Sequence, residues 1–380
     1  MIKTDSAISI LELGSTHVRL AVYDKLILNQ NLFYEKKINY TRNETIKDNH
    51  PIVDLIIKAE KDIGQHLNEV ILMVDSHSIY SLDFSIQKIF DKKNITNDDI
   101  DYLINESENI VKINNKEKDI LHIIKSNIFF DDKIIENLEN ISHEASKVTL
   151  ELKFIMINKK SLNFLKNLFL KKHISLINIF CISYIKSLGL INKIGISGYS
   201  SFIDIGLNKS SLAIFNDNKL LYLNNTHIGG NHVTKDITKV LKMDYRKAEA
   251  QKFKFSKHND LENNVKENNL LKKIINSRLE EIIELLFLNC PLVQNKFFNS
   301  DLKLFFTGNG SKVLNENLLS FGSEFNFISE MSVINEGKKD CCNSALNFNT
   351  DHEKSQPQKT NITLENKGFF EKLFDYFTKK

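Results

Sequence analysis

The most informative stretch for the fold is S-F-I-D-I-G-L-N-K-S-S-L-A-I-F, from Ser201 to Phe215. Its pattern predicts a buried strand, a tight turn that begins at Gly206, and a second strand. Asp204 precedes the glycine by two residues. A carboxylate at a strand end beside a phosphate-binding turn can hold a water molecule of a bound Mg²⁺. The alternative is an ordinary hairpin, in which Lys209 is a solvated turn residue.

The stretch I-L-E-L-G-S-T-H-V-R-L, from Ile10 to Leu20, repeats this layout. Here Glu12 precedes Gly14 by two residues, and Ser15 and Thr16 follow in the turn. Such a turn exposes backbone N–H groups and two hydroxyls, which suit phosphate oxygens. A Gly-Ser hairpin without a ligand is again the alternative. The two stretches differ in most residues but share the strand–turn–strand layout, which indicates an internal duplication.

Two further segments with paired or closely spaced glycines follow the second hairpin along the chain. His227 to Lys242 carries a Gly-Gly pair before a predicted helix, a possible anion site, and A-E-A-Q-K follows at Ala248 to Lys252. F-F-T-G-N-G-S-K, beginning at Phe305, is a buried strand that runs into Gly308 and Gly310. Glycines at that place let a backbone approach a flat ligand closely. Each segment alone is more often an ordinary loop, so their order along the chain is the informative feature.

That order resembles the actin-like ATPase superfamily, and the run G-G-N-H-V-T-K-D-I with A-E-A-Q-K is similar to the FtsA family of bacterial division proteins. The resemblance covers essentially the whole chain. It implies an α/β, actin-like two-lobed fold built from duplicated β-β-β-α-β-α units. It also implies an inserted small α+β subdomain and a C-terminal amphipathic helix.

The resemblance implies ATP and Mg²⁺ as ligands and assigns the contacts by position. The implied nucleotide-binding residues are Gly14, Ser15 and Thr16 in the first hairpin, Asp204 and Gly206 in the second, Gly229 and Gly230 before the helix, Glu249 and Lys252 near ribose and adenine, and Gly308 and Gly310 near adenosine. Glu12 and Asp204 are the candidates for holding Mg²⁺ through water. Catalytic residues are not assigned.

The chain departs from the family pattern within these motifs. Glu12 and His17 stand where the family has Asp and Lys, and Asn309 replaces a glycine. In the second hairpin, Leu207-Asn208-Lys209 replaces two glycines and a threonine, which restricts the backbone and removes a hydroxyl. These changes predict weak nucleotide binding and weak or absent ATPase activity.

The last residues of the chain have a different composition from the rest. At about 100° per residue, a helix over 368–380 places its large apolar side chains in an arc of about 140°. These membrane-facing candidates are Phe369, Phe370, Leu373, Phe374 and Phe377, accompanied by the basic residues Lys372, Lys379 and Lys380. Such a helix is too short to span a bilayer and suits its interface. Docking back on its own domain is the alternative, which a long polar linker disfavours.

The domain boundaries follow from these patterns. We expect lobe 1 over 1–77 and 157–196, with about 325–347, the inserted subdomain over 78–156, the core of lobe 2 over 197–227 and 303–324, its tip over 228–302, a flexible linker over 348–367, and the membrane-targeting helix over 368–380.

Composition excludes several classes of protein. The net charge, 51 − 48 = +3, gives no basic surface for nucleic acid. No window of about 18 apolar residues exists to cross a membrane. The four cysteines fit neither a disulfide scaffold nor a zinc spacing, which favours a reduced cytoplasmic compartment.

The resemblance implies a cell division adaptor that assembles the division ring, the septal divisome. It would bind the C-terminal tail of FtsZ at the lobe 2 tip, with Lys235 and Lys239 as candidate contacts, and tether FtsZ filaments to the cytoplasmic face of the inner membrane at the division site. Self-association into filaments and binding of later division proteins are also implied. The alternatives are a PilM-like scaffold for pilus assembly, disfavoured by the amphipathic tail, and a small-molecule kinase, disfavoured by the altered second hairpin.

Overall fold

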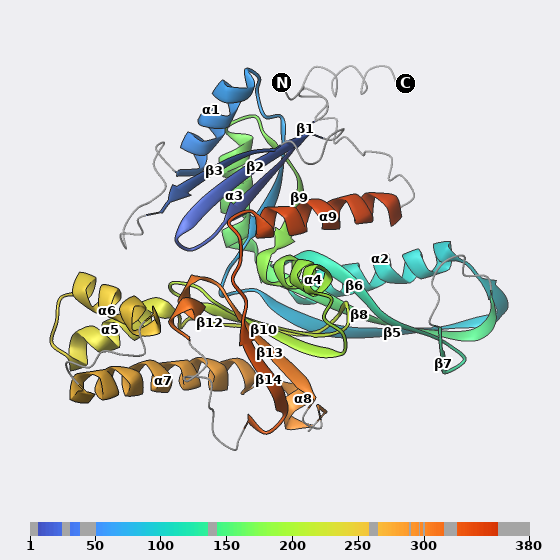
Figure 1. Cartoon of the computed structure of the whole chain (residues 1–380). Coiled ribbons are helices and arrows are strands. Elements are labelled where there is room, and N and C mark those ends of the chain that lie inside the picture. Colours follow the sequence, from blue (N-terminus) through green and yellow to red (C-terminus); the bar gives the residue numbers. More distant parts are fainter. Residues whose placement is uncertain are drawn as a thin grey trace.

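The computed structural model of the chain describes residues 7–24, 31–38, 51–135, 143–257, 265–288, 290–295, 297–298, 301–314 and 325–355. The amphipathic helix expected over 368–380 lies outside these residues, as does the linker from 356 to 367. Figure 1 shows a sheet at each end of the molecule, with a third sheet projecting to one side.

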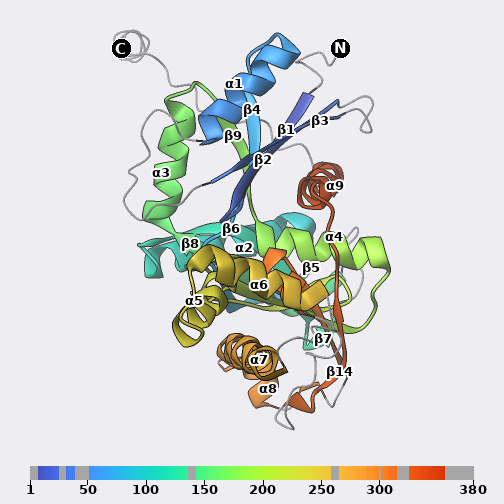
Figure 2. The same ribbon diagram turned by 60° about the vertical axis from the view of Figure 1, so that its left-hand side comes forward.

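The first sheet has the strand order β3-β2-β1-β4-β9. Its strands and the helices beside them are β1 Ala7–Leu13, β2 His17–Asp24, β3 Asn31–Lys37, α1 Pro51–Ile63, β4 Glu69–Val74, α3 Lys159–Leu170, β9 Ser175–Cys181, α4 Ile182–Ile194 and α9 Asp340–Ser355. Figure 2 shows α1 and α3 on one face of this sheet and α9 on the other. Because both faces are covered, the apolar run of β4 is almost continuously buried.

The second sheet has the strand order β12-β11-β10-β13-β14. A later part of the chain thus repeats the strand arrangement of the first sheet. Its elements are β10 Tyr199–Ile205, β11 Ser210–Asn216, β12 Lys219–Thr226, α5 Gly230–Val240, α6 Tyr245–Lys257, α7 Val265–Phe287, α8 Pro291–Gln294, β13 Leu302–Thr307, the 3₁₀ helix η2 Asn309–Val313, and β14 Ile328–Val333. In each sheet the central strand pairs antiparallel with the next strand and parallel with a later one. The duplication that the sequence predicted is therefore present in the structure.

The third sheet forms the inserted subdomain that we expected over 78–156. Its order is β5-β8-β6-β7, and it carries one helix. The bounds are β5 Tyr80–Ile95, α2 Asn97–Asn114, β6 Lys118–Phe130, β7 Lys133–Ile134 and β8 His143–Asn158. This sheet and its helix share a separate hydrophobic core, which includes Leu150 and Phe154. Ser81 joins it to the second sheet, since the N–H of Leu223 donates to the Ser81 hydroxyl at 3.0 Å.

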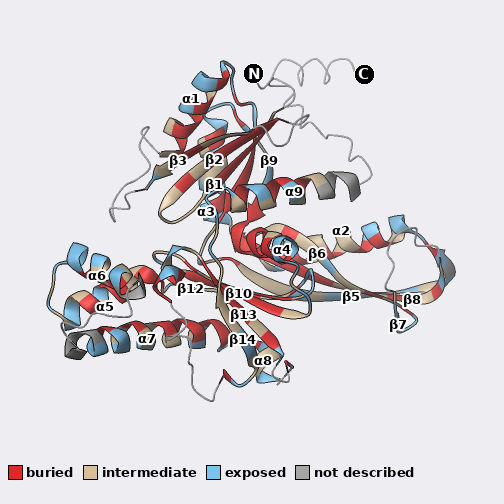
Figure 3. Cartoon of the chain, viewed as in Figure 1, coloured by how far each residue is buried: buried red, intermediate tan, exposed pale blue. Residues whose placement is uncertain are grey.

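Helices α4 and α9 pack against each other between the first two sheets. Figure 3 shows buried residues along both helices where they face each other and the sheets. A Cβ placed on Gly189 of α4 would lie 2.5 Å from Cβ of Ser344 on α9, so the close crossing depends on a glycine. The buried core is continuous through these helices from the first sheet to Phe202 and Phe215 of the second. This core joins the two lobes.

Two of the expected boundaries differ from the structure. We placed 325–347 in lobe 1, but β14 pairs with β13 and belongs to lobe 2, so α9 is the part that packs on lobe 1. We also expected a linker from Phe348, whereas α9 continues to Ser355. Within this helix, buried Asn349 accepts a hydrogen bond from Asn178 at 2.8 Å, a contact that a polar composition does not reveal.

Within the part of the chain that the structure describes, no helix combines the length and the apolar composition needed to cross a bilayer.

Candidate functional site

A cleft of about 800 Å³ lies between the two lobes, where the two hairpins face each other. It brings together residues from both halves of the chain. Of the residues singled out in the sequence, it is lined by Glu12, Gly14, Ser15, Thr16, Asp204, Gly206, Gly230, Glu249, Lys252, Gly308 and Gly310. Gly229 does not line it. The four motifs therefore meet at one place, although they are up to about three hundred residues apart.

The two hairpins have the same local geometry. The N–H of Gly14 donates to the carbonyl of His17 at 3.0 Å, and the N–H of Gly206 donates to the carbonyl of Lys209 at 2.9 Å. A Cβ on Gly14 would lie 2.9 Å from that carbonyl oxygen, and one on Gly206 would lie 3.0 Å from its counterpart. A side chain at either position would therefore crowd the carbonyl oxygen that closes the turn.

The two hairpins also contact each other, and the second hairpin contacts the opposite lobe. The N–H of Leu207 lies 3.4 Å from the hydroxyl of Ser15, its acceptor. Lys209 forms an ion pair with Asp75, which follows β4 in the opposite lobe, and the two side chains are 13% and 17% exposed. Lys209 is therefore not the solvated turn residue that the sequence indicated. It connects the lobes.

The N-terminus of α5 is occupied by the second hairpin. The N–H of Gly230 donates to the carbonyl of Gly206 at 2.9 Å, and the N–H of Asn231 donates to that of Leu207 at 2.7 Å. A Cβ on Gly229 would lie 2.6 Å from the Gly206 oxygen. The Gly-Gly pair thus allows close packing of two backbone segments, and the first N–H groups of this helix are not free for an anion.

The last glycine segment also packs against the second hairpin. Gly308 has φ of +84°, and a Cβ there would lie 2.1 Å from Oδ1 of Asp204. A Cβ on Gly310 would lie 2.4 Å from the side chain of Ile205. These glycines bring η2 against the end of β10, and the cleft wall forms as a result.

Glu249 and Lys252 come from α6. The ammonium of Lys252 is buried and donates to Thr234 Oγ1 at 2.7 Å, Glu249 Oε2 at 2.7 Å and the Gly230 carbonyl at 3.1 Å. Burial lowers the pKa of Lys252, although the hydrogen bond to Glu249 opposes this. These three acceptors use the three N–H bonds of the ammonium, so Lys252 holds Glu249 in place and has no N–H left for a ligand.

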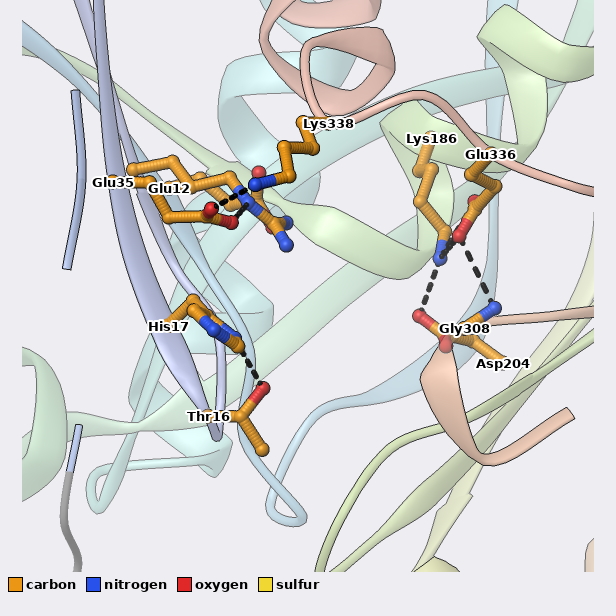
Figure 4. A network of polar contacts seen from close by, with 10 residues as sticks. Glu12, Thr16, His17, Glu35, Lys186, Asp204, Gly308, Glu336 and Lys338 are labelled. Atoms are coloured by element: carbon orange, nitrogen blue, oxygen red, sulfur yellow. Dashed lines mark hydrogen bonds and ion pairs between the residues drawn. The ribbon is translucent and has the colours of Figure 1, made fainter. Parts of the chain in front are cut away.

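A residue that the sequence reasoning missed lies beside Asp204. Nζ of Lys186, on α4, donates to Oδ2 of Asp204 at 2.6 Å and lies 2.9 Å from Oε1 of Glu336. Figure 4 shows both side chains converging on Asp204 and Gly308. Burial opposes the charged form of Lys186, but the two carboxylates outweigh it and raise its pKa. The signal that could have revealed it is the position of Lys186 in the middle of the apolar part of α4, whereas Lys193 lies in the last turn.

A second charged cluster lies beside the first hairpin. Arg19 donates to Glu12 Oε1 at 2.8 Å and to Glu35 Oε1 at 2.9 Å, and Lys338 donates to the other oxygen of Glu35 at 2.7 Å. Burial raises the pKa of Glu12 despite Arg19. Burial also acts to raise the pKa of Glu35, but the hydrogen bonds from Lys338 and Arg19 outweigh it and lower this pKa to about 2. Figure 4 shows this cluster apart from the one around Lys186.

These contacts test the expected Mg²⁺ site. Mg²⁺ prefers octahedral oxygen ligands and keeps several waters. Both candidate carboxylates are instead bonded to cations of the chain, Glu12 to Arg19 and Asp204 to Lys186. Among the described residues, no group of three or more His, Cys, Asp or Glu side chains is arranged to hold a metal. While these ion pairs persist, the residues do not fit Mg²⁺.

Solved structures define the fold. The chain is similar to the PilM–PilN type IV pilus biogenesis complex, with a TM-score of 0.55, 12% identity, and coverage of 86% of this chain and 88% of that one. It is also similar to MreB5 of Spiroplasma citri bound to ADP, with a TM-score of 0.51, 13% identity, and coverage of 93% and 98%. At these identities the likeness concerns the fold alone. The chain has the actin-like ATPase fold, as the sequence predicted.

Within this class, residues 201–362 match the model of the family described as cell division protein FtsA. The matched range begins at the second hairpin and includes the Gly-Gly segment, A-E-A-Q-K and the last glycine segment. The expected resemblance to FtsA is confirmed over this part of the chain. A comparison with proteins of curated function gave no match.

Proposed function

We propose that this protein is a cell division adaptor of the FtsA type, which links FtsZ filaments to the cytoplasmic face of the inner membrane at the division site. The match of residues 201–362 to the FtsA family model, on an actin-like fold, carries this proposal. The amphipathic pattern of 368–380 supports the membrane contact. Self-association into filaments and contacts with later division proteins belong to the same proposal.

The cleft would bind an adenine nucleotide. Its volume of about 800 Å³ lies within the range of small-molecule sites. The structurally similar MreB5 was solved with ADP. Leu207 and the occupied α5 N-terminus leave few free N–H groups for phosphates, so the affinity would be low and hydrolysis slow or absent.

The membrane contact would come from the apolar arc of 368–380. Burying four phenylalanines and one leucine supplies about 1.5–3 kcal/mol each before the helix is ordered. The lysines of this segment add up to about 1 kcal/mol each with anionic lipids. Together these terms are large enough for peripheral binding.

Sedimentation with vesicles of phosphatidylglycerol and phosphatidylethanolamine tests this contact. The full chain should sediment, and a chain that lacks 368–380 should stay in the supernatant. Phe374→Glu lies within the apolar arc and should abolish binding, whereas Thr378→Glu adds the same charge on the polar side and should retain most of it. Equal sedimentation of these two variants would contradict the proposal.

The FtsZ contact would lie at the lobe 2 tip over 228–302. Lys235 and Lys239 are both exposed on α5 and can meet an acidic peptide. Fluorescence anisotropy with a labelled FtsZ C-terminal peptide should show binding that Lys235→Glu with Lys239→Glu abolishes. Lys160→Glu, an exposed lysine on α3, is the matched control and should bind like the unchanged protein. Unaltered binding by the double variant would exclude this surface.

A pilus-assembly scaffold is the second candidate. The structural alignment with the PilM–PilN complex includes most of this chain and most of that one, at a TM-score of 0.55. The same anisotropy measurement with a PilN peptide separates the two. Binding of that peptide, without binding of the FtsZ peptide, would favour the pilus function.

A further inference from the structure

Lys186 is a buried cation at the base of the cleft. Its side chain is 8% exposed, and its ammonium bridges Asp204, at the end of β10, and Glu336, which follows β14. The N–H of Gly308 donates to the same Glu336 carboxylate at 3.1 Å. The ammonium is therefore held at the meeting point of the second hairpin and the last glycine segment, and it borders the cleft.

A lysine at such a place needs compensation. Burial disfavours an isolated ammonium by several kcal/mol, which paired carboxylates with good geometry offset. An ammonium has three N–H donors. Nζ of Lys186 lies 2.6 Å from Oδ2 of Asp204 and 2.9 and 3.2 Å from the two oxygens of Glu336. Lys186 also lines the cleft, so a bound phosphate would compete with Glu336 for one of these N–H donors.

Lys186 lies between the Asp204 carboxylate and the cleft, where a nucleotide site commonly holds a divalent cation, and Glu336 shares its single positive charge. A cation held by a carboxylate faces the phosphates and neutralises part of their charge. The ammonium of Lys186 is 2.6 Å from the Asp204 carboxylate. A Mg²⁺ ion bound to that carboxylate would therefore lie close to the ammonium, and the two positive charges would repel strongly.

We propose that Lys186 takes the place of the divalent cation, so that the cleft binds an adenine nucleotide without Mg²⁺. This inference rests on the nucleotide binding proposed above. Lys186 is then the residue that determines the metal dependence of the site. At the first hairpin Arg19 pairs with Glu12, so each expected metal ligand already faces a cation of the chain.

Isothermal titration of the full chain with ADP, once with EDTA and once with excess Mg²⁺, tests the inference. The two dissociation constants should agree within about threefold. Binding that requires Mg²⁺ would overturn the role of Lys186 while leaving nucleotide binding in place. Absence of binding under both conditions would overturn nucleotide binding, and this inference with it.

Variants at position 186 sharpen the test. Lys186→Gln should weaken ADP binding in EDTA by about tenfold or more, and Mg²⁺ should restore part of the loss because Asp204 becomes available. Lys186→Arg keeps the charge and should remain independent of Mg²⁺. Lys312→Gln, another lysine that lines the cleft, should change affinity equally with and without Mg²⁺. Equal losses of Lys186→Gln under both conditions would contradict the proposal.

Near-UV circular dichroism shows whether Lys186→Gln folds, since unpaired carboxylates could destabilise it. Titration of the unchanged protein with Mg²⁺ alone keeps the inference testable in that case. No heat of binding is expected, and tight binding of Mg²⁺ would overturn the inference.

Discussion

Glu12 and Asp204 occupy the same position in the two repeated hairpins, yet each is neutralised from a different direction. Arg19 lies directly opposite Glu12 in the β1–β2 register and forms its ion pair. Ser211 lies at the corresponding register position opposite Asp204. The cation for Asp204 comes instead from Lys186 on α4. One repeat is thus neutralised by its own hairpin, and the other depends on tertiary packing.

Replacing Gly189 by Ala should destabilise the junction of the lobes. The added Cβ would lie 2.5 Å from Ser344 Cβ and 1.9 Å from its hydroxyl oxygen, so α4 and α9 must separate. Overpacking of this kind costs about 1–3 kcal/mol, more than the gain of about 1 kcal/mol in helix propensity. Denaturant unfolding should show a lower midpoint.

Two variants control this measurement. Asn192→Ala lies on the exposed side of α4 and should change the free energy of unfolding by less than about 0.5 kcal/mol. Combining Gly189→Ala with Ser344→Gly should recover part of the loss. No recovery in the double variant would show that the contact is not the cause.

Lys209→Met should destabilise the protein by about 1–3 kcal/mol, because it leaves the carboxylate of Asp75 unpaired between the lobes. Lys36→Met removes a comparable pair with Asp54 whose side chains are 42% and 43% exposed, and it should cost less than about 1 kcal/mol. Free energies of unfolding for both variants check the difference. Similar values would mean that Lys209 does not connect the lobes energetically.

Stability should decrease in acid through Glu35. Its pKa is lowered to about 2 from 4.5, against the effect of burial, by hydrogen bonds from Lys338 and Arg19. A lowered folded-state pKa means that the contribution is fully present above pH 4.5 and is lost as the pH falls towards 2. Free energies of unfolding of the wild type and of Glu35→Gln should therefore converge over this interval. A constant difference between them at all pH values would contradict this assignment.

The four cysteines should resist labelling in the folded protein. All four are buried, and burial raises the pKa of Cys181 to about 12 and the pKa of Cys341 and of Cys342 well above the ordinary value. The thiolate is the reactive form, so little of it exists at neutral pH. Reaction with Ellman's reagent should be negligible before unfolding and should yield four thiols afterwards. Rapid labelling of one thiol in the native state would contradict this prediction.

Much of the site could be predicted because its motifs are local. Gly14 and Gly206 each close a turn onto a residue three positions later, and that geometry follows from a few adjacent residues. The layout of strands around these turns therefore indicated a duplicated fold correctly. The structure brings the glycine segments together at one cleft, apart from Gly229, and their contact with a nucleotide stays a prediction. Their packing against the second hairpin was not foreseen.

The partners of the charged groups could not be predicted in this way. Lys186 and Glu336 are 150 positions apart, and Lys209 and Asp75 are 134 apart. Nothing in the pattern around Lys209 distinguishes a solvated turn lysine from one that pairs across two lobes. The end of α9 was also missed, since Asn349 is polar in the sequence but buried in the fold.

The repeated hairpins, the duplicated α/β architecture and the inserted subdomain can be read from the sequence alone, because apolar periodicity and turn glycines act over a few residues. Which cation faces each carboxylate of the cleft depends on tertiary packing. That choice depends on which side chains share a low-dielectric space, and this is settled when α4 and α9 bring the lobes together. The same packing determines that Lys186, and not a metal ligand set, lies beside Asp204.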